Sequence, residues 1–384
     1  MNKLCRQVSI ESPASAASGQ RFVFSCDVPV PDVPSRGARI RVVCAGACYL
    51  PRRSASLGSS ESASSFSDET SVLTSDVSVE GDFPLAQPHQ HGVRDASLFP
   101  GYEVAGQVEA LGDEVLVDCG FAIGDRVIVY PYEGVPPGYV EYLVVPQLDY
   151  LIKIPDTMPL SVAAMLPAGA LLAMNTVFSA HEHVQNLLSE RGEDSICNIL
   201  IVGTGGLALW ALRLAAYFFS EMKERVGITI ASLKDDGLVA AQEFQRVNVV
   251  QWNEDLYERQ LIERTMDACG GQVDVVIDFG TTSRSLHRSL QCLGKGGVVF
   301  VIRDVADRLL PKFSRRAEER HQSIRPVEPG SLEQLNELVE LVGSGKIEPP
   351  PHTVYPADQA FDVVQKLCHS KIQGRAILRF YPAD

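Results

Sequence analysis

Residues 199–208, Ile-Leu-Ile-Val-Gly-Thr-Gly-Gly-Leu-Ala, run directly into Leu-Trp-Ala-Leu-Arg-Leu-Ala-Ala at 209–216. An apolar run, a glycine-rich turn and an amphipathic segment indicate a buried strand, a tight turn and a helix. Such a unit holds a dinucleotide, because a pyrophosphate lies well on the free N–H groups at the positive end of a helix dipole. The stretch therefore predicts a nucleotide-binding βαβ unit.

The residues of the turn have separate expected roles. Gly203 permits the tight turn, Gly205 lets the backbone approach a pyrophosphate, and the small Ala208 lets helix and strand pack closely. The other members of the predicted cofactor site in this turn are Thr204, Gly206 and Leu207. A glycine-rich turn is common by itself, and a βαβ unit can be purely structural, so the rest of the chain has to support the interpretation.

Residues 199–219 also allow a membrane interpretation, because they are nearly all apolar and about long enough to cross a bilayer. Three early glycines divide the run, and Arg213 interrupts its apolar face. The pattern favours a strand followed by a helix in an α/β protein.

Composition limits the class of protein. The chain has 384 residues, 45% of them hydrophobic, which is enough for two domains. A net charge of −14 without a basic cluster argues against nucleic acid or an anionic membrane surface as the main partner. A small-molecule substrate is the expected partner. The nine cysteines form no C-x-x-C pair, and the N-terminus has no apolar signal segment, so a cytoplasmic location is expected.

The pattern of the chain changes near residue 161. Residues 38–44 alternate as a half-buried strand does, and several short strands follow between 104 and 145, which predicts a β-rich, barrel-like N-terminal domain. From there helices and strands alternate, which predicts a parallel sheet covered on both faces. The expected elements are helices at 161–180, 207–219, 285–293 and 332–342, and strands at 199–202, 228–233, 273–279 and 298–302; a turn-rich tail ends in a strand at 375–380.

Residues 52–82 are rich in serine and acidic groups and have few large apolar side chains. Such a composition does not offset the entropy of ordering, so a disordered loop is expected. Serines beside acidic residues are compatible with phosphorylation, but a tolerated surface insertion is the favoured interpretation.

Several segments, in order along the chain, resemble motifs of the medium-chain dehydrogenase/reductase superfamily. They are GYEVAGQV at 101–108, FAIGDRV at 121–127, GYVEYLVV at 138–145, AAMLPAGA at 163–170, VDVVIDFG at 273–280, GKGG at 294–297, and SGKI at 344–347 with QGRA at 373–376. The resemblance implies an α/β fold with a GroES-like β-barrel domain and a Rossmann domain with a doubly wound parallel sheet. The implied boundaries are 1–160 for the GroES-like domain, 161–328 for the Rossmann domain, and 329–384 for a segment that completes the first domain.

The resemblance also indicates which chemistry is missing. Zinc-dependent members hold their metal with Cys, His and a further Cys or acidic residue. Here Cys48 occupies the first position, but Tyr102 and Ala168 occupy the other two, and Leu50 replaces the hydroxyl residue that relays the substrate proton. No zinc is therefore expected. An alternative zinc site would combine Cys48 with His89 or His91 and Glu103.

Zinc-free relatives pass hydride from a nicotinamide to a quinone or an α,β-unsaturated carbonyl, while the protein positions the reactants and donates a proton. Tyr102 is the first candidate donor, because a phenol stabilises a developing enolate oxygen without a metal. Tyr49 and Cys48 are further catalytic candidates. Packed tyrosine rings and a buried small cysteine are the structural alternatives. Glu103 is expected to pair with a nearby cation.

The choice of cofactor depends on the residues after the second Rossmann strand. An acid there binds the ribose hydroxyls of NAD, whereas a 2′-phosphate needs a hydroxyl and a cation. Ser232 occupies the position and Lys234 lies two residues later, which favours NADP(H) over NAD(H), although Asp235 and Asp236 come next. Gly280, at the end of the VDVVIDFG segment, completes the predicted cofactor site.

Two functions remain open at this point. The first is a zinc-independent NAD(P)H-dependent oxidoreductase that acts on a quinone, enal or other carbonyl compound. The second is a catalytically inactive relative that binds nucleotide and serves as a regulatory or interaction module. The resemblance further implies a homodimer formed through the strand at 298–302, at the edge of the Rossmann sheet.

Overall fold

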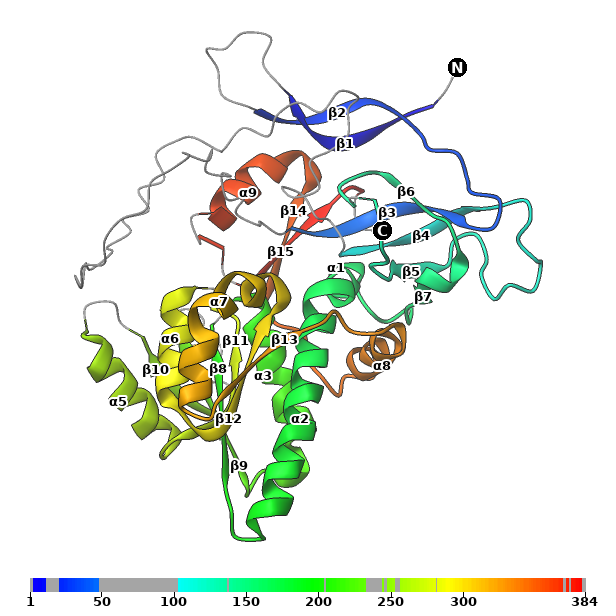
Figure 1. Ribbon diagram of the computed structural model, residues 1–384. Coiled ribbons are helices and arrows are strands. Elements are labelled where there is room, and N and C mark those ends of the chain that lie inside the picture. The colour runs from blue at the N-terminus through cyan, green and yellow to red at the C-terminus, as the bar shows by residue number, and fades with distance from the viewer. Residues whose placement is uncertain are drawn as a thin grey trace.

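The computed structural model describes residues 3–11, 21–47, 103–136, 138–203, 205–232, 244, 247–252, 256–280, 282–368, 371–372 and 374–381. The predicted serine-rich loop at 52–82 lies outside these residues. Figure 1 shows a lower body built on one sheet and an upper body built on another, with both chain ends at the upper body.

The lower sheet has six parallel strands in the order β10-β9-β8-β11-β12-β13. The chain order reverses between β8 and β11, which is the topological switch point where such sheets bind ligands at their carboxyl ends. The predicted doubly wound sheet is confirmed. Its strands are β8 (Cys197–Val202), β9 (Val226–Ser232), β10 (Val247–Gln251), β11 (Val273–Asp278), β12 (Leu293–Ile302) and β13 (Ser323–Val327).

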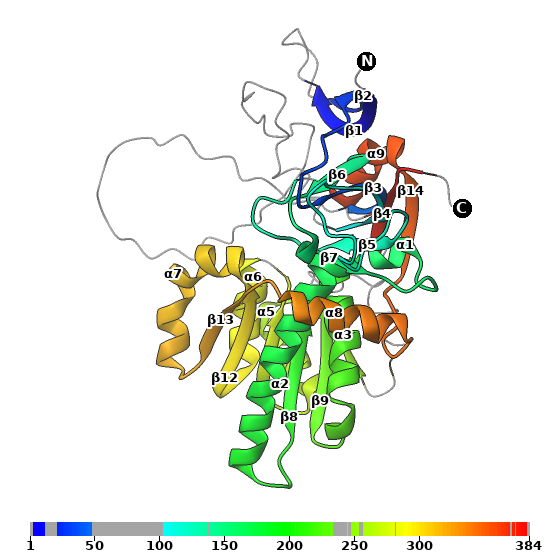
Figure 2. The ribbon, with the colours of Figure 1, turned by 90° about the vertical axis from the view of Figure 1, so that its right-hand side faces the viewer.

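Helices cover both faces of this sheet (Figures 1 and 2). Alternate residues of β8 explain why its sequence is continuously apolar. Ile199 and Ile201 belong to the core beneath α2 and α3, whereas Leu200 and Val202 belong to the core beneath α5, α6 and α7. The helices are α2 (Leu171–Arg191), α3 (Gly206–Phe218), α5 (Glu258–Cys269), α6 (Ser283–Cys292), α7 (Arg303–Glu319) and α8 (Leu332–Gly343).

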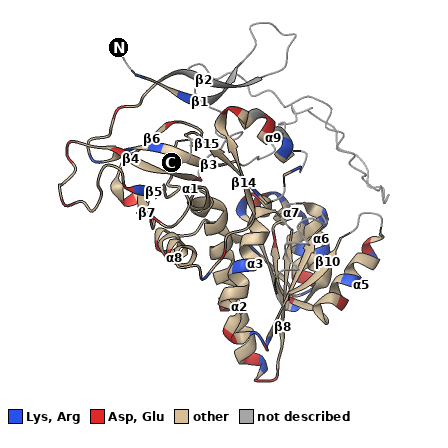
Figure 3. Cartoon of the chain, turned by 180° about the vertical axis from the view of Figure 1, so that it is seen from behind, with Lys and Arg blue, Asp and Glu red and all other residues tan. Residues whose placement is uncertain are grey.

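The run 199–219 is thus divided into β8 and α3, as expected. Among the described residues, no helix has both the length and the apolar character needed to span a membrane. In Figure 3, acidic and basic residues are interspersed over the helices rather than gathered by sign.

The upper sheet joins the two ends of the chain. Its order is β14-β15-β3-β4-β5-β7, and β6 also pairs with β3. The C-terminal strand β15 pairs antiparallel with β3 from the N-terminal part. The exact domain boundaries stay a prediction. The strands are β3 (Ala38–Ala47), β4 (Val104–Leu111), β5 (Arg126–Val129), β6 (Tyr142–Val145), β7 (Leu151–Lys153), β14 (His352–Pro356) and β15 (Arg375–Arg379).

A separate hairpin, β1 (Leu4–Glu11) and β2 (Arg21–Pro29), lies against the upper sheet. Arg6 fixes it there: its backbone N–H and its guanidinium both donate to the Glu141 carboxylate, and Nη2 donates to the carbonyl of Phe380 at 2.8 Å. The hairpin is therefore attached to the residue after β15 as well as to the sheet.

The prediction of one continuous helix at 161–180 is wrong, because the helical segment is interrupted. The chain forms α1 (Leu160–Ala163), then a π-helical turn at Leu166–Ala170, and then α2, which continues to Arg191. Pro167 lacks a backbone N–H, and the N–H of Gly169 donates outside the helix, so the regular i to i−4 pattern is interrupted here.

Strand β12 is not at the sheet edge, so the pairing surface expected at 298–302 is wrong. Strand β13 pairs with the outer side of β12 and forms the sheet edge. Its sequence, Ser-Ile-Arg-Pro-Val, is difficult to recognise as a strand because it contains Pro326. Proline is tolerated in an edge strand where the missing N–H faces outward. The homodimer itself stays a prediction.

Several other helices and strands were not predicted, because their sequence patterns are weak. The expected turn-rich tail contains β14, a 3-10 turn at Ala357–Gln359 and the helix α9 (Ala360–Cys368). Strand β10 and helices α5 and α7 also lay outside the expected elements. Helices α5 and α7 have polar residues over most of their surface and bury only narrow apolar stripes, which explains why their periodicity is difficult to recognise.

Candidate functional site

The glycine turn after β8 has the geometry that its sequence predicts. Gly203 has a φ of 111°, in the region that favours glycine, and its N–H donates to the carbonyl of Ala231 at 2.8 Å. A Cβ at this position would lie 3.5 Å from the Cβ of Ala208. A glycine and a small alanine therefore allow strand β8 and helix α3 to lie close together.

The N-terminus of α3 is open to an anion. Gly205 caps the helix, no cap hydrogen bond from a side chain is present among the described residues, and the first turn contains no acidic residue. Gly205 is exposed, and a Cβ on it would meet no atom of the described residues within 4 Å. The first-turn N–H groups without an acceptor among the described side chains, together with the positive end of the dipole, suit a phosphate group.

A cation from the other sheet lies beside this helix end. Arg375, in β15, extends over Gly206, where a Cβ would overlap the Cδ atom of the arginine. Figure 1 shows that β15 begins close to the lower body and runs up into the upper one. The Arg375 side chain is only 14% exposed. Because a guanidinium beside the positive end of a helix is unfavourable by itself, an anion bound between them would be stabilised by both.

Glu103 holds this arginine in place. Its side chain is 5% exposed and forms an ion pair with Arg375, while Oε1 accepts from the backbone N–H of Gly169 at 2.9 Å. Gly46 leaves room for the carboxylate, because a Cβ there would overlap it. The cation expected for Glu103 is therefore Arg375.

The site joins the two bodies of the molecule. Glu103 and Arg375 belong to the upper part, whereas Gly169 lies in the π-helical turn before α2, and Gly206 begins α3. The irregular turn is explained by this contact, since the Gly169 N–H is directed to Glu103 instead of continuing a helix.

The described residues do not fit a zinc ion at this point. Ala168, in the π-helical turn, offers no ligand, and both oxygens of Glu103 are engaged by Arg375 and Gly169. Within the described ranges, no three His, Cys, Asp or Glu side chains converge. Cys48, His89 and His91, the other members of the alternative zinc set, lie outside them.

The catalytic candidates Cys48, Tyr49 and Tyr102 also lie outside the described residues, as do Thr204 and Lys234 of the cofactor site. Two nearby residues are described. The N–H of Gly46 in β3 donates to the carbonyl of Glu103 at 2.8 Å, which places these two chain segments side by side at the Arg375 ion pair.

Gly280 and Ser232 lie at the carboxyl ends of strands that flank the turn. The N–H of Gly280 donates to Oδ1 of Asp278 at 2.8 Å, and a Cβ on Gly280 would lie 2.6 Å from the Oγ of Ser285. Ser232 is buried at the end of β9, and its carbonyl accepts from the N–H of Trp252 at 2.7 Å. Contacts of Leu207, Ser232 and Gly280 with a nucleotide remain a prediction.

Asp278 makes the stability of this region depend on pH. Burial raises the pKa of Asp278 to about 6, against hydrogen bonds from Gly280, Ser289 and Ser285 that lower it. Because the folded state binds this proton more tightly than the unfolded state, its contribution to the free energy of unfolding falls as the pH rises from about 4 to about 6. Asp278→Asn is expected to remove that decline, measured by chemical unfolding at several pH values. The same decline in the variant would contradict the assignment.

The sequence patterns identify the turn but give no role to Arg375, which they include only within the QGRA segment. Sequence patterns did not reveal the role of Arg375, because this role depends on a contact in space with Glu103, from which it is separated by 272 positions.

Comparisons with known proteins agree with this arrangement. The family "Alcohol dehydrogenase GroES-like domain" matches residues 68–156, and the family "Zinc-binding dehydrogenase" matches residues 255–378. A zinc-type alcohol dehydrogenase-like protein of Schizosaccharomyces pombe is 24% identical over 304 residues, which cover 73% of this chain and 82% of that protein.

An NAD-dependent alcohol dehydrogenase of Sulfolobus acidocaldarius is 23% identical over 307 residues, covering 73% of this chain and 82% of the relative. The solved structure of the quinone oxidoreductase from Coxiella burnetii superposes with a TM-score of 0.63 at 16% identity and covers 99% of each chain. At this identity the superposition shows a shared fold.

Proposed function

Because the chain belongs to the medium-chain dehydrogenase/reductase superfamily and is an oxidoreductase of that type, we propose that it is a zinc-independent reductase. Its proposed cofactor is NADP(H) in preference to NAD(H), and its proposed substrate is a quinone, an enal or another carbonyl compound.

The arginine beside the helix end carries this proposal. Arg375 is held by a buried carboxylate against the first residue of α3, where the amides have no other acceptor among the described side chains. This combination of a fixed cation and free N–H groups matches the charge and shape of a pyrophosphate.

Each residue then has one task. A bound nicotinamide supplies the hydride. Arg375 and the amides at the start of α3 bind the pyrophosphate, and Glu103 orients Arg375. Tyr102, adjacent in sequence to Glu103, donates a hydrogen bond to the substrate oxygen as negative charge develops there. Tyr49 and Cys48 are proposed to line the substrate position.

Zinc independence is supported by two features of the described residues. Ala168 has no ligand atom, and Glu103 would have to leave both Arg375 and the Gly169 amide to bind a metal. Breaking a buried ion pair in this way leaves an uncompensated charge and costs about 3–5 kcal/mol.

The preference for NADP(H) rests on Ser232. The residue at the end of β9 is a buried serine rather than an acid, so no carboxylate at this position repels a 2′-phosphate. Lys234 is proposed as the cation that accompanies it.

Fluorescence titration with NADPH and NADH tests the proposal first, followed by the rate of NADPH oxidation with a panel of quinones, enals and aldehydes. Saturable binding with tighter NADPH than NADH, and turnover of at least one acceptor, is expected. Binding without turnover would favour the inactive, nucleotide-binding relative. No binding at millimolar nucleotide would contradict both functions.

Tyr102→Phe is expected to lower kcat by about 10- to 100-fold while the dissociation constant of NADPH is unchanged, because the hydroxyl acts only on the reacting oxygen. Tyr257→Phe, at a tyrosine that is 81% exposed in the lower body, is the control for loss of a phenol outside the site. An unchanged kcat in Tyr102→Phe would remove its role as donor.

A further inference from the structure

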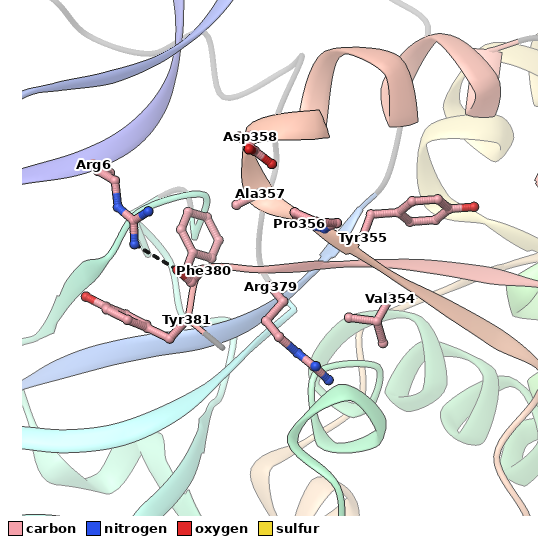
Figure 4. A pocket seen from close by; sticks show the side chains of 9 residues that line it. All are labelled: Arg6, Val354, Tyr355, Pro356, Ala357, Asp358, Arg379, Phe380 and Tyr381. Carbon is pink, nitrogen blue, oxygen red and sulfur yellow. Dashed lines mark hydrogen bonds between the residues drawn. The ribbon is translucent and has the colours of Figure 1, made fainter. Parts of the chain in front are cut away.

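Arg379 and Asp278 are charged side chains that the fold covers and that have no task in the proposed reaction. Arg379 is half-buried beside a cavity of about 590 Å³, but in Figure 4 it points to one side of β15 and Phe380 to the other. A ligand in the cavity would therefore not contact the guanidinium and the aromatic ring together. Asp278, in contrast, is buried at the carboxyl edge of the lower sheet, where the nucleotide is proposed to bind.

Asp278 is the last residue of β11, which lies next to β8 at the switch point of the sheet. It is in register with Val202, the last residue of β8, directly before the Gly203 turn. The next residue, Phe279, donates its N–H to the carbonyl of Val202 at 3.1 Å, and a Cβ on Gly203 would lie 3.8 Å from the Cβ of Phe279. The segment after Asp278 thus packs against the turn that is proposed to hold the pyrophosphate.

The Asp278 carboxylate fixes the turn that follows it. Oδ1 accepts from the N–H of Gly280 at 2.8 Å, and Oδ2 accepts from the Oγ of Ser289, in α6, at 2.9 Å. Ser285, in the first turn of α6, is a third hydrogen-bond partner. A Cβ on Gly280 would lie 2.6 Å from the Oγ of Ser285, so only glycine leaves room for this turn. Asp278 therefore joins the end of β11 to the start of α6 around Gly280, a predicted cofactor residue.

This carboxylate is satisfied by neutral groups. Asp278 is 2% exposed, and within the described ranges its hydrogen-bond partners are one amide and two hydroxyls. Burial raises its pKa to about 6, although those bonds favour the charged form. Because a hydroxyl can accept as well as donate, Ser289 can accept the proton of a neutral carboxyl group while Oδ1 still accepts from Gly280. Both protonation states therefore fit the same arrangement.

In the part of the chain that the structure describes, the surrounding elements add no charge that shifts the pKa of Asp278. Its register partners on the neighbouring strands are Val202 and Val301, and the residues that α2 buries include no titratable side chain. The titratable side chains of α6 have other surroundings: Arg284 and Arg288 pair with Glu258, His287 contacts Arg316, and burial raises the pKa of the Cys292 thiol to about 12. An anion that binds at the turn would thus be a new charge close to Asp278.

We propose that Asp278 positions the Gly280 turn for the nucleotide and takes up a proton when the anionic nucleotide binds there. The inference rests on the proposed function, because it requires a nucleotide at the carboxyl edge of the sheet. An anion brought close to a buried carboxylate favours the neutral form of that carboxyl group. By linkage, the nucleotide binds more weakly as rising pH ionises Asp278.

Calorimetric titration with NADPH at about pH 6.5, in buffers that differ in their enthalpy of ionisation, measures the protons taken up on binding. If binding raises the pKa of Asp278 from about 6 to about 7, the parent chain takes up about half a proton more than Asp278→Asn. The 2′-phosphate of NADPH also titrates near this pH, but its contribution is the same in both chains. NADH, which lacks that phosphate, is expected to give the same difference.

The affinity for NADH provides a second readout. In the parent chain it is expected to fall about 10-fold between about pH 5 and about pH 8, the factor that corresponds to one pKa unit. Asp278→Asn should lack this fall and bind NADH more tightly than the parent chain at about pH 8, because its amide resembles the neutral carboxyl group. A merely structural role would instead weaken binding at every pH.

Asp274→Asn is the matched control. Asp274 lies near the opposite end of the same strand, about 13 Å from Asp278, and pairs with Arg191 at 2.7 Å. This variant is expected to keep the proton uptake of the parent chain. Equal uptake by the parent chain and Asp278→Asn would overturn the role of Asp278 and leave nucleotide binding intact, whereas a parent chain that binds neither nucleotide would contradict the proposed function as well.

If Asp278→Asn does not fold, Ser289→Ala decides. Loss of a donor to the charged form raises the pKa of Asp278 in the free chain, so the decline in NADH affinity should move to higher pH. A decline at the same pH as in the parent chain would contradict the proposal.

Discussion

Replacing Arg375 by glutamine is expected to weaken NADPH binding about 100-fold, because the variant loses charged hydrogen bonds to the pyrophosphate. The same change removes the partner of a carboxylate that is 5% exposed, so the free energy of unfolding is expected to fall by about 3 kcal/mol. Fluorescence titration and chemical unfolding measure the two effects.

The double variant Glu103→Gln with Arg375→Gln separates these effects. With the buried charge removed and an amide oxygen left to accept from Gly169, much of the stability is expected to return. NADPH affinity should remain low, because the cation is still missing. If affinity returned together with stability, Arg375 would be a structural residue and would not bind the nucleotide.

The second large effect is expected from alanine at adjacent glycines. In Gly206→Ala the new Cβ overlaps Arg375, so the arginine has to move, and both stability and NADPH affinity are expected to fall, stability by about 2 kcal/mol. In Gly205→Ala the Cβ meets no atom of the residues that the structure describes, and φ is −75°, so stability should change by less than about 1 kcal/mol.

Gly205→Ala should nevertheless weaken NADPH binding, because its methyl group would enter the open face where the pyrophosphate is proposed to lie. A variant that loses NADPH affinity but keeps the stability of the parent chain identifies a residue that faces the ligand. If NADPH bound Gly205→Ala as tightly as the parent chain, the nucleotide would not lie over this turn. Thermal unfolding and fluorescence titration of the three proteins provide the comparison.

Local chemistry made the centre of the fold predictable. The run 199–216 predicts its own strand, turn and helix, because its apolar residues are buried on both faces of a parallel sheet and its glycines fit one backbone geometry. The starts of α6 and α8 are likewise encoded locally, by Thr282 and Ser331, which cap their first turns.

The candidate site was much less predictable, because it depends on contacts between distant segments. The Glu103 to Arg375 pair joins residues 272 positions apart, and the π-helical turn exists because Gly169 donates to that carboxylate. Gly206 was placed in the site by its motif, but the structure shows that it makes room for a side chain from another sheet. No periodicity in the sequence contains this information.

The proposed reaction is the reduction of a carbonyl compound or quinone by a pyridine nucleotide that Arg375 and the α3 turn hold, without zinc. The rate of NADPH oxidation in the presence of a quinone, before and after treatment with a zinc chelator, tests it most directly. Equal rates are predicted. A rate that is lost on chelation and restored by one equivalent of zinc would mean that the reaction depends on the metal, against the proposed zinc-independent reduction.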